Sequence, residues 1–341
     1  MTHLSSEIVR ADDADQRLDR WLRRNFGKLP QSLIEKMCRK GSVKVDGKKV
    51  KPSFRLEPEQ VITLPESIGT DISKTNKPGV LSGYDHSIIN QLNSNIIYED
   101  DYLVAINKPP GLATQGGTNQ RGHLDKYLNH LTLTKKVEQL RLIHRLDRET
   151  SGVLLTAKSL IATREMMKLF KTKNVGKFYW AVSHGVPNPK NGEIKSSLVE
   201  DRSQASRRMT SVGTLHHVPG NNAKLALTNY SVQFTFGKLL ALVLLFPQTG
   251  RTHQLRVHLS SINHPILGDN KYSATPSSSS LPIDMQEAKL GSRMFLHARS
   301  LRFQHPFLKK EITIRAEVPK HFEDLAKYLE WDLKNLPDTT F

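Results

Sequence analysis

Apolar residues recur at helical spacing near the start of the chain, first between Leu18 and Phe26 and again between Leu33 and Cys38. Gly41 ends the second run. The segment Val43–Lys48 then alternates and reaches Asp46-Gly47, a pair typical of a tight turn between strands. We therefore predict two helices and a strand turn in this part of the chain.

Residues 67–95 have a different character, because Ser, Asn, Thr, Lys and Gly dominate and apolar periodicity is poor. This composition predicts a linker that is at best partly ordered. A chain of 341 residues has room for two domains. We therefore expect one domain over residues 1–66, the linker over 67–95, and a larger domain over 96–341.

Strand patterns prevail in the larger domain. The segment Ile96–Gly111 predicts two strands around an acidic turn, and Val153–Leu155 predicts a buried strand. Lys177–Val182 is rich in aromatic residues and also predicts a strand, as does the apolar run Leu242–Leu245.

Two segments of the larger domain have a helical pattern. The first extends from Lys158 to Lys173, and its core-facing candidates are Ile161, Met166, Leu169 and Phe170. The second follows Gly250 and places Leu255, Leu259 and Ile262 at helical spacing.

The charge balance indicates which kind of molecule the protein binds. The chain has 50 Lys+Arg against 33 Asp+Glu, a formal charge of +17, which favours a polyanion and nucleic acid over membrane. Between residues 16 and 51, twelve basic residues oppose three acidic ones. These charges are either solvated helix faces or phosphate contacts. The candidate RNA contacts here are Arg17, Arg39, Lys40 and Lys44.

Three further observations limit the class of protein. No stretch approaches the roughly 18 continuous apolar residues of a membrane-spanning helix. Met1–Gln16 carries three Asp and one Glu without an apolar core, unlike a signal or transit peptide. The single cysteine, Cys38, excludes an intrachain disulfide and a multi-cysteine zinc site. We expect a cytoplasmic protein.

The most informative stretch is Ile143–Val153, which reads I-H-R-L-D-R-E-T-S-G-V. It places Asp147 between Arg145 and Arg148, directly before the predicted buried strand. Nearby positive charge favours the charged form of a carboxylate. Asp147 is therefore our candidate for a catalytic carboxylate.

This stretch resembles the signature H-R-L-D-x-x-T-S-G of the RluA/RluC/RluD family of pseudouridine synthases and matches every fixed position. Arg39–Gly47 is similar to an S4 RNA-binding domain, and Lys49–Pro52 is closer to the RluC branch. The resemblance implies an α+β catalytic domain with a central mixed, mostly antiparallel sheet and flanking helices. It also implies a small S4-like α/β domain at the N-terminal side.

The resemblance also implies roles for individual residues. Asp147 would be catalytic, Tyr179 would lie against the target base, and Arg251 would pair with Asp147. Arg145 would fill the space that the base leaves, although a structural ion pair is an equal alternative. The other candidate RNA contacts in this domain are Lys108, Arg148, His253 and Arg256.

A metal site is disfavoured. His253 and His258 are five positions apart, so they do not share a helix face, and neither Cys nor a nearby acid completes a site with His264. No metal or other cofactor is expected, since the isomerisation imports no group.

We expect the chain to convert uridine to pseudouridine in 23S ribosomal RNA, within naked RNA or an assembly intermediate, as a monomer. The alternatives are a non-catalytic RNA-binding or ribosome-assembly protein, the same chemistry on another RNA such as tRNA, or a nucleosidase that uses Asp147. The sequence does not indicate which uridines are modified. It also assigns no role to the loops at 212–224 and 273–283.

Overall fold

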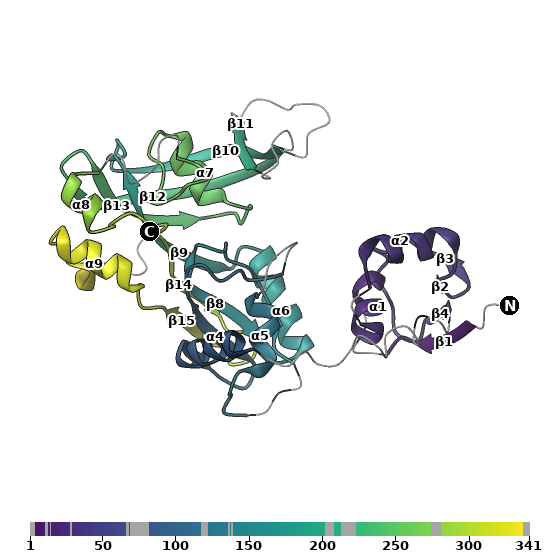
Figure 1. Cartoon of the computed structure of the whole chain (residues 1–341). Helices are drawn as coiled ribbons and strands as arrows, with labels where there is room; N and C mark the ends of the chain where they lie inside the picture. Colours follow the sequence, from purple (N-terminus) through teal and green to yellow (C-terminus); the bar gives the residue numbers. More distant parts are fainter. Residues whose placement is uncertain are drawn as a thin grey trace. The chain divides into compact units, whose positions relative to one another are not determined.

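The computed structural model describes residues 4–10, 13, 15–27, 29–65, 68, 82–116, 122–135, 137, 139–201, 208–212, 223–273 and 281–336. The chain forms two compact units, Met1–Gly83 and Tyr84–Phe341 (Figure 1). Each unit has its own buried apolar cluster.

The N-terminal unit combines two helices with a four-stranded sheet. The helices are α1 (Leu18–Phe26) and α2 (Gln31–Lys40). The strands, in the order β1-β4-β2-β3, are β1 (Leu4–Ile8), β4 (Val61–Pro65), β2 (Lys44–Val45) and β3 (Lys48–Lys49). Leu22, Ile34 and Ile62 share one buried cluster, so the helices pack on this sheet. The two predicted helices and the predicted strand turn are confirmed.

The C-terminal unit is built on an eleven-stranded sheet with the order β11-β10-β12-β13-β9-β14-β8-β6-β5, to which β15 adds at β14 and β7 at β8. The strands are β5 (Ile96–Glu99), β6 (Leu103–Lys108), β7 (Arg141–Leu142), β8 (Ser151–Ala157), β9 (Val175–His184), β10 (Asn191–Asp201), β11 (Arg208–Val212), β12 (Lys224–Phe236), β13 (Leu240–Pro247), β14 (Leu296–Gln304) and β15 (Glu311–Arg315). Strands β8 and β14 pair in parallel, and every other pairing between its named strands is antiparallel. The predicted α+β class and the mixed, mostly antiparallel sheet are confirmed.

Helices flank this sheet (Figure 1). They are α4 (Gly83–Ser94), α5 (Leu124–Tyr127), α6 (Leu160–Lys171), α7 (Gln254–Ser261), α8 (Ile283–Glu287) and α9 (Lys320–Tyr328), with short 3-10 turns η2 (Leu128–His130) and η3 (Leu333–Asn335). Within the described ranges, the structure has no helix with the length and apolar character that a membrane crossing requires.

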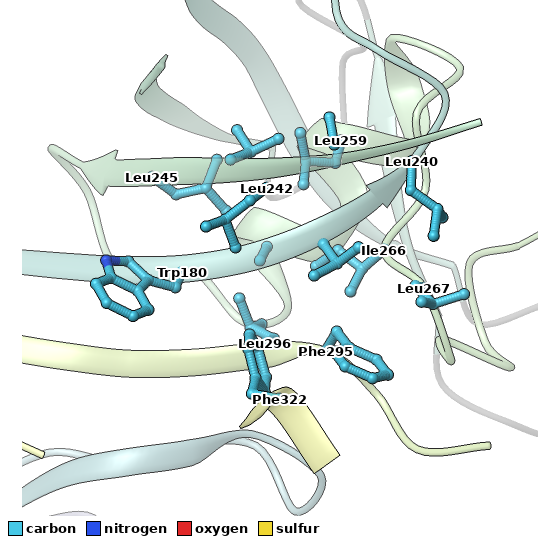
Figure 2. Packing of buried hydrophobic residues seen from close by; sticks show 14 of the residues in the cluster. Trp180, Leu240, Leu242, Leu245, Leu259, Ile266, Leu267, Phe295, Leu296 and Phe322 are labelled. Atoms are coloured by element: carbon cyan, nitrogen blue, oxygen red, sulfur yellow. The ribbon is translucent and has the colours of Figure 1, made fainter. Parts of the chain in front are cut away.

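The largest apolar cluster lies where β9, β13 and β14 meet helices α7 and α9. All eight residues of β13 are buried, which explains why this strand has a continuous apolar run and no alternation. Figure 2 shows Phe322 of α9 beside Phe295 and Leu296, and the Phe295 and Phe322 ring centroids are 4.9 Å apart.

The predicted linker is wrong at its C-terminal part. Residues 83–94 form α4, which is held by tertiary contacts that its weak periodicity does not reveal. Ile89 and Leu92 are buried, and the buried carboxylate of Asp85 accepts hydrogen bonds from Tyr127 Oη at 2.6 Å and Lys126 Nζ at 2.7 Å. Of the predicted linker, residues 67 and 69–81 lie outside the described residues.

Helix α6 confirms the helix predicted over Lys158–Lys173, with Ser159 accepting a hydrogen bond from Ala162 N as N-cap. The prediction of Ile161 as a core residue is wrong, because 66% of its surface is exposed, whereas Met166 is buried. Of the two loops without an assigned role, residues 213–222 and 274–280 lie outside the described residues.

Strands β8 and β14 approach each other closely at Gly152. Ser151 is paired with His297, and Gly152 with Ala298, whose other neighbour across the sheet is Tyr179 of β9. Gly152 has φ 109, and a Cβ added there would lie 2.2 Å from the carbonyl oxygen of Ala298. Only glycine fits this close approach without moving the backbone.

We expect Gly152→Ala to lower the free energy of unfolding by about 2–4 kcal/mol, because the added methyl group pushes β8 from β14 and φ becomes strained. Gly83→Ala is the matched control, since a Cβ at Gly83 meets nothing within 4 Å. Denaturant unfolding of the full chain, followed by circular dichroism, measures both. Equal midpoints for the two variants would contradict the close approach.

Candidate active site

Asp147 lies in the loop between β7 and β8, directly before the close approach at Gly152. Thr114 holds this loop from behind, since its Oγ1 donates to the carbonyl oxygen of Leu146 at 2.7 Å and accepts from Leu146 N at 3.2 Å. A further turn bond joins Thr150 N to the Asp147 carbonyl at 3.2 Å. The backbone of Asp147 is therefore fixed on both sides.

Lys108 also supports this loop, and its predicted contact with RNA is wrong. The side chain is fully buried, and Nζ donates to the carbonyl oxygens of Pro109, Leu112 and Arg148 at 2.8, 2.9 and 3.1 Å. Burial lowers the pKa of Lys108 to about 7, although the negative charges of Glu149 and Asp147 act to raise this pKa. Three carbonyl acceptors match the three donors of an ammonium group, so Lys108 holds the backbone of this loop.

Arg256 is the arginine that contacts the Asp147 carboxylate. From α7, its Nη1 donates to Asp147 Oδ2 at 3.2 Å, while Nε and Nη2 hold the buried Asp269 carboxylate at 2.7 and 2.8 Å. Burial lowers the pKa of Arg256, but its bonds with Asp269 and the charges of both carboxylates raise it more. Arg256 is thus a fixed positive charge beside Asp147, and its predicted role as an RNA contact gives way to this one.

The predicted pairing of Arg251 with Asp147 is wrong. Arg251 is exposed, and its Nε donates to the carbonyl oxygen of Leu225 at 3.2 Å. Gln254 fixes this turn, since its Oε1 accepts from Arg251 N at 3.0 Å and its Nε2 donates to Thr228 Oγ1 at 2.9 Å. Arg251 lines the same cavity as Asp147, but the arginine in contact with the Asp147 carboxylate is Arg256.

His253 completes the surroundings of Asp147. It is the N-cap residue of α7, with φ 54, and its Nε2 lies 3.7 Å from Asp147 Oδ2. Its Nδ1 is 2.7 Å from the Tyr272 hydroxyl, and burial lowers the pKa of His253, although the Asp147 charge opposes this shift. Among the described residues, no group of three or more His, Cys, Asp or Glu side chains is placed to hold a metal ion.

Asp147 opens into a cavity of about 520 Å³. Tyr179 of β9 and Leu296 of β14 also line it, and 21% of the Asp147 side chain is exposed. Burial raises the pKa of Tyr179, and the Asp147 charge raises it further, so the hydroxyl stays protonated. Asp147 and Tyr179 thus line one cavity, and the roles expected for them stay predictions.

Basic side chains surround this cavity. Arg145 is exposed, and Lys171, Lys173 and Lys177 line the wall near α6. Burial, with a smaller effect from Lys173, lowers the pKa of Lys177 to about 8. His144 is held in neutral form, since burial lowers its pKa to about 3, and its Nε2 accepts from Leu155 N at 2.9 Å. Sequence reasoning missed Asp269 and Thr114, which carry no local signal of their long-range partners.

The candidate RNA contacts in the N-terminal unit differ in how exposed their side chains are. Arg39 and Lys40 are exposed in the last turn of α2, and Lys44 is half-buried on β2. Arg17 forms an ion pair with Asp19 at 2.6 Å, which occupies one edge of its guanidinium group. Their contacts with RNA stay predictions.

Comparison with known proteins agrees with these motifs. The family model described as RNA pseudouridylate synthase matches residues 102–261, and the S4 domain model matches residues 16–62. The ribosomal large subunit pseudouridine synthase C of Rickettsia bellii is 34% identical over 307 residues, which cover 90% of this chain and 95% of the relative. Its namesake from Vibrio cholerae is 33% identical over 313 residues, 92% of each chain.

Solved structures agree as well. Human RNA pseudouridylate synthase domain containing 4 superposes with a TM-score of 0.59 at 31% identity, covering 73% of this chain and 98% of that chain. Human RNA pseudouridylate synthase domain containing 1 superposes with a TM-score of 0.52 at 26% identity, covering 72% of this chain and 96% of that chain. The resemblance drawn from the motifs is confirmed: the chain belongs to the RNA pseudouridylate synthase family and carries an S4 domain in its N-terminal unit.

Proposed function

We propose that this protein isomerises uridine to pseudouridine in large-subunit ribosomal RNA, with Asp147 as its catalytic carboxylate. One observation carries the assignment: Asp147 Oδ2 lies 3.2 Å from Arg256 Nη1 and opens into a cavity that Tyr179 also lines. The substrate follows the names of the bacterial relatives, which are large-subunit pseudouridine synthases.

The reaction breaks the N1–C1′ bond of uridine, turns the base and joins C5 to C1′. The C5 proton leaves and N1 gains one, so the product is an isomer. Cleavage develops positive charge at C1′, which a nearby carboxylate stabilises. Asp147 either attacks C1′ or removes the C2′ proton, and Arg256 orients it for both routes. Water must be excluded from the cavity during this step, because it would otherwise capture the detached sugar.

Tyr179 would pack on the uracil, and its hydroxyl is coupled to the state of Asp147. Negative charge on Asp147 is one cause of the raised pKa of Tyr179. Both routes neutralise that carboxylate for a time, either by a bond to C1′ or by the proton from C2′. When C5 joins C1′, the ester bond breaks or the proton returns to C2′, so Asp147 is charged again before the C5 proton leaves. Tyr179 lines the same cavity and would assist that last proton transfer.

The target base must leave its stack, which costs a few kcal/mol. Arg145 supports this step, because it is exposed at the mouth of the cavity and forms no side-chain hydrogen bond among the described residues. Its planar guanidinium group can stack on the neighbouring bases in place of the uridine. Arg148 is also exposed, and we expect it to contact the same RNA.

We expect Asp147→Asn to reduce turnover by at least about 1,000-fold, because the amide can neither attack C1′ nor accept a proton. The dissociation constant for RNA should stay within about threefold, since the amide keeps the shape of the site. Tritium release from 5-³H-uridine in large-subunit rRNA transcript, with product nucleosides identified, measures turnover.

The same assay separates the alternatives. Free uracil as product would indicate a nucleosidase, and binding without release by the wild type would indicate an assembly protein. Near-normal release by Asp147→Asn would show that another residue is catalytic.

Arg256→Lys should lower kcat by about 10- to 100-fold, since an ammonium group keeps a charge for Asp269 but has no second arm for Asp147. Arg251→Lys is the matched control from the same turn, with an expected effect below about threefold because its hydrogen bond is exposed. Single-turnover rates at saturating enzyme measure both. A larger loss for Arg251→Lys would restore the pairing expected from the motif.

Tyr179→Phe keeps the ring and removes the hydroxyl. We expect RNA binding to be retained and turnover to fall by about 10²- to 10⁴-fold, the range for loss of a proton-transfer group. Tyr179→Leu, which also removes the ring face, should weaken binding in addition. Unchanged tritium release by Tyr179→Phe would exclude the hydroxyl from the proton step.

A further inference from the structure

A second cavity, of about 600 Å³, is lined by Arg148, the residue that follows Asp147. Helix α4 contributes Tyr84 and Ile88, and the segment Pro109–Ala113 forms another wall. Arg293, which precedes β14, completes the basic part of the lining. Its volume falls within the range of about 300–1,000 Å³ typical of ligand sites.

The side chains around this second cavity are available to a ligand. Tyr84 is 62% exposed, and neither its hydroxyl nor the Arg293 guanidinium has a hydrogen-bond partner among the described residues. Arg148 uses Nε on the carbonyl oxygen of Gly111 at 3.0 Å, with Glu149 3.4 Å away, and its two Nη groups have no acceptor in the described part of the chain. No described carboxylate lines the cavity.

The backbone that carries these groups is already held in place. Beside Tyr84, the Asp85 carboxylate accepts from Tyr127 Oη and Lys126 Nζ at 2.6 and 2.7 Å. On the opposite wall, Gly111 N donates to the carbonyl oxygen of Arg148 at 2.9 Å. A ligand therefore meets a formed site, and binding orders little beyond the side chains.

We propose that this cavity binds an unpaired nucleotide that flanks the target uridine, with its base on Tyr84 and its phosphate between Arg148 and Arg293. Unpaired bases stack on aromatic rings, and guanidinium groups bind phosphate with two donors. Arg148 directly follows Asp147 in the chain, and the two residues line the two cavities, so we expect RNA with a uridine at Asp147 to reach this cavity with a flanking nucleotide. The proposal rests on the proposed function for the identity of the RNA.

The test compares full-length Tyr84→Ala, Tyr84→Phe and Arg293→Gln with the wild type. Two RNAs are used. The long fragment is a piece of large-subunit rRNA chosen because it binds the wild type, and the short fragment is the same RNA cut back to its paired part. Tyr84→Ala should raise Kd and KM for the long fragment at least about fivefold and have no effect on the short one. Tyr84→Phe, which keeps the ring, should restore binding. Tyr328→Ala, another exposed tyrosine, is the surface control.

Arg293→Gln should reduce the slope of log Kd against log salt concentration by about 0.7, the value for one phosphate contact on a single strand. Tyr84→Ala should leave this slope unchanged. Equal Kd values for the wild type, Tyr84→Ala and Arg293→Gln on the long fragment would overturn the proposal. Because Kd needs no turnover, absence of pseudouridine would defeat the proposed function and still leave this comparison decisive.

Discussion

One short parallel pairing joins the two parts of the large sheet. This pairing connects β14 to β8 through His297 with Ser151 and Ala298 with Gly152. Strands β6 and β5 join the sheet through β8. The same contact sets the position of the loop before β8 and aligns Gly152, Ala298 and Tyr179 across three strands. Asp147 and Tyr179 thus come from opposite sides of a junction that glycine alone permits. The geometry of the site is a consequence of how the sheet is joined.

The charges of the site are arranged around Arg256, whose three guanidinium nitrogens are all engaged. Asp269 accepts from Nε and Nη2, and Asp147 accepts from Nη1, so the guanidinium group has one orientation. Such an arrangement needs no reorganisation when charge develops on the substrate, which is how preorganised dipoles and charges accelerate reactions. It also makes Asp269, although 13 residues from Arg256 in sequence, part of the positioning of Asp147.

Sequence reasoning singled out Asp147 from a nine-residue motif and Tyr179 from the family resemblance of its strand, and both line one cavity. It failed at Arg251 and Arg256, which share one motif near the start of α7. The left-handed His253 and the bonds of Gln254 decide which of the two turns inward, and spacing does not encode either. Helix α4 was missed for a related reason, since its apolar periodicity is weak and the buried contacts of Asp85 stabilise it.

The burial of Lys108 affects how inactive variants at this position should be interpreted. Its ammonium group ties the end of β6 to the carbonyl oxygen of Arg148, and no other side chain offers three donors from one compact point. Replacement by arginine would keep the charge and still fail, because the planar group does not fit the same three carbonyl groups. A genetic screen that recovers Lys108 variants as inactive would therefore identify defects in the folding of the Asp147 loop. A basic residue at the active site is not evidence of contact with nucleic acid.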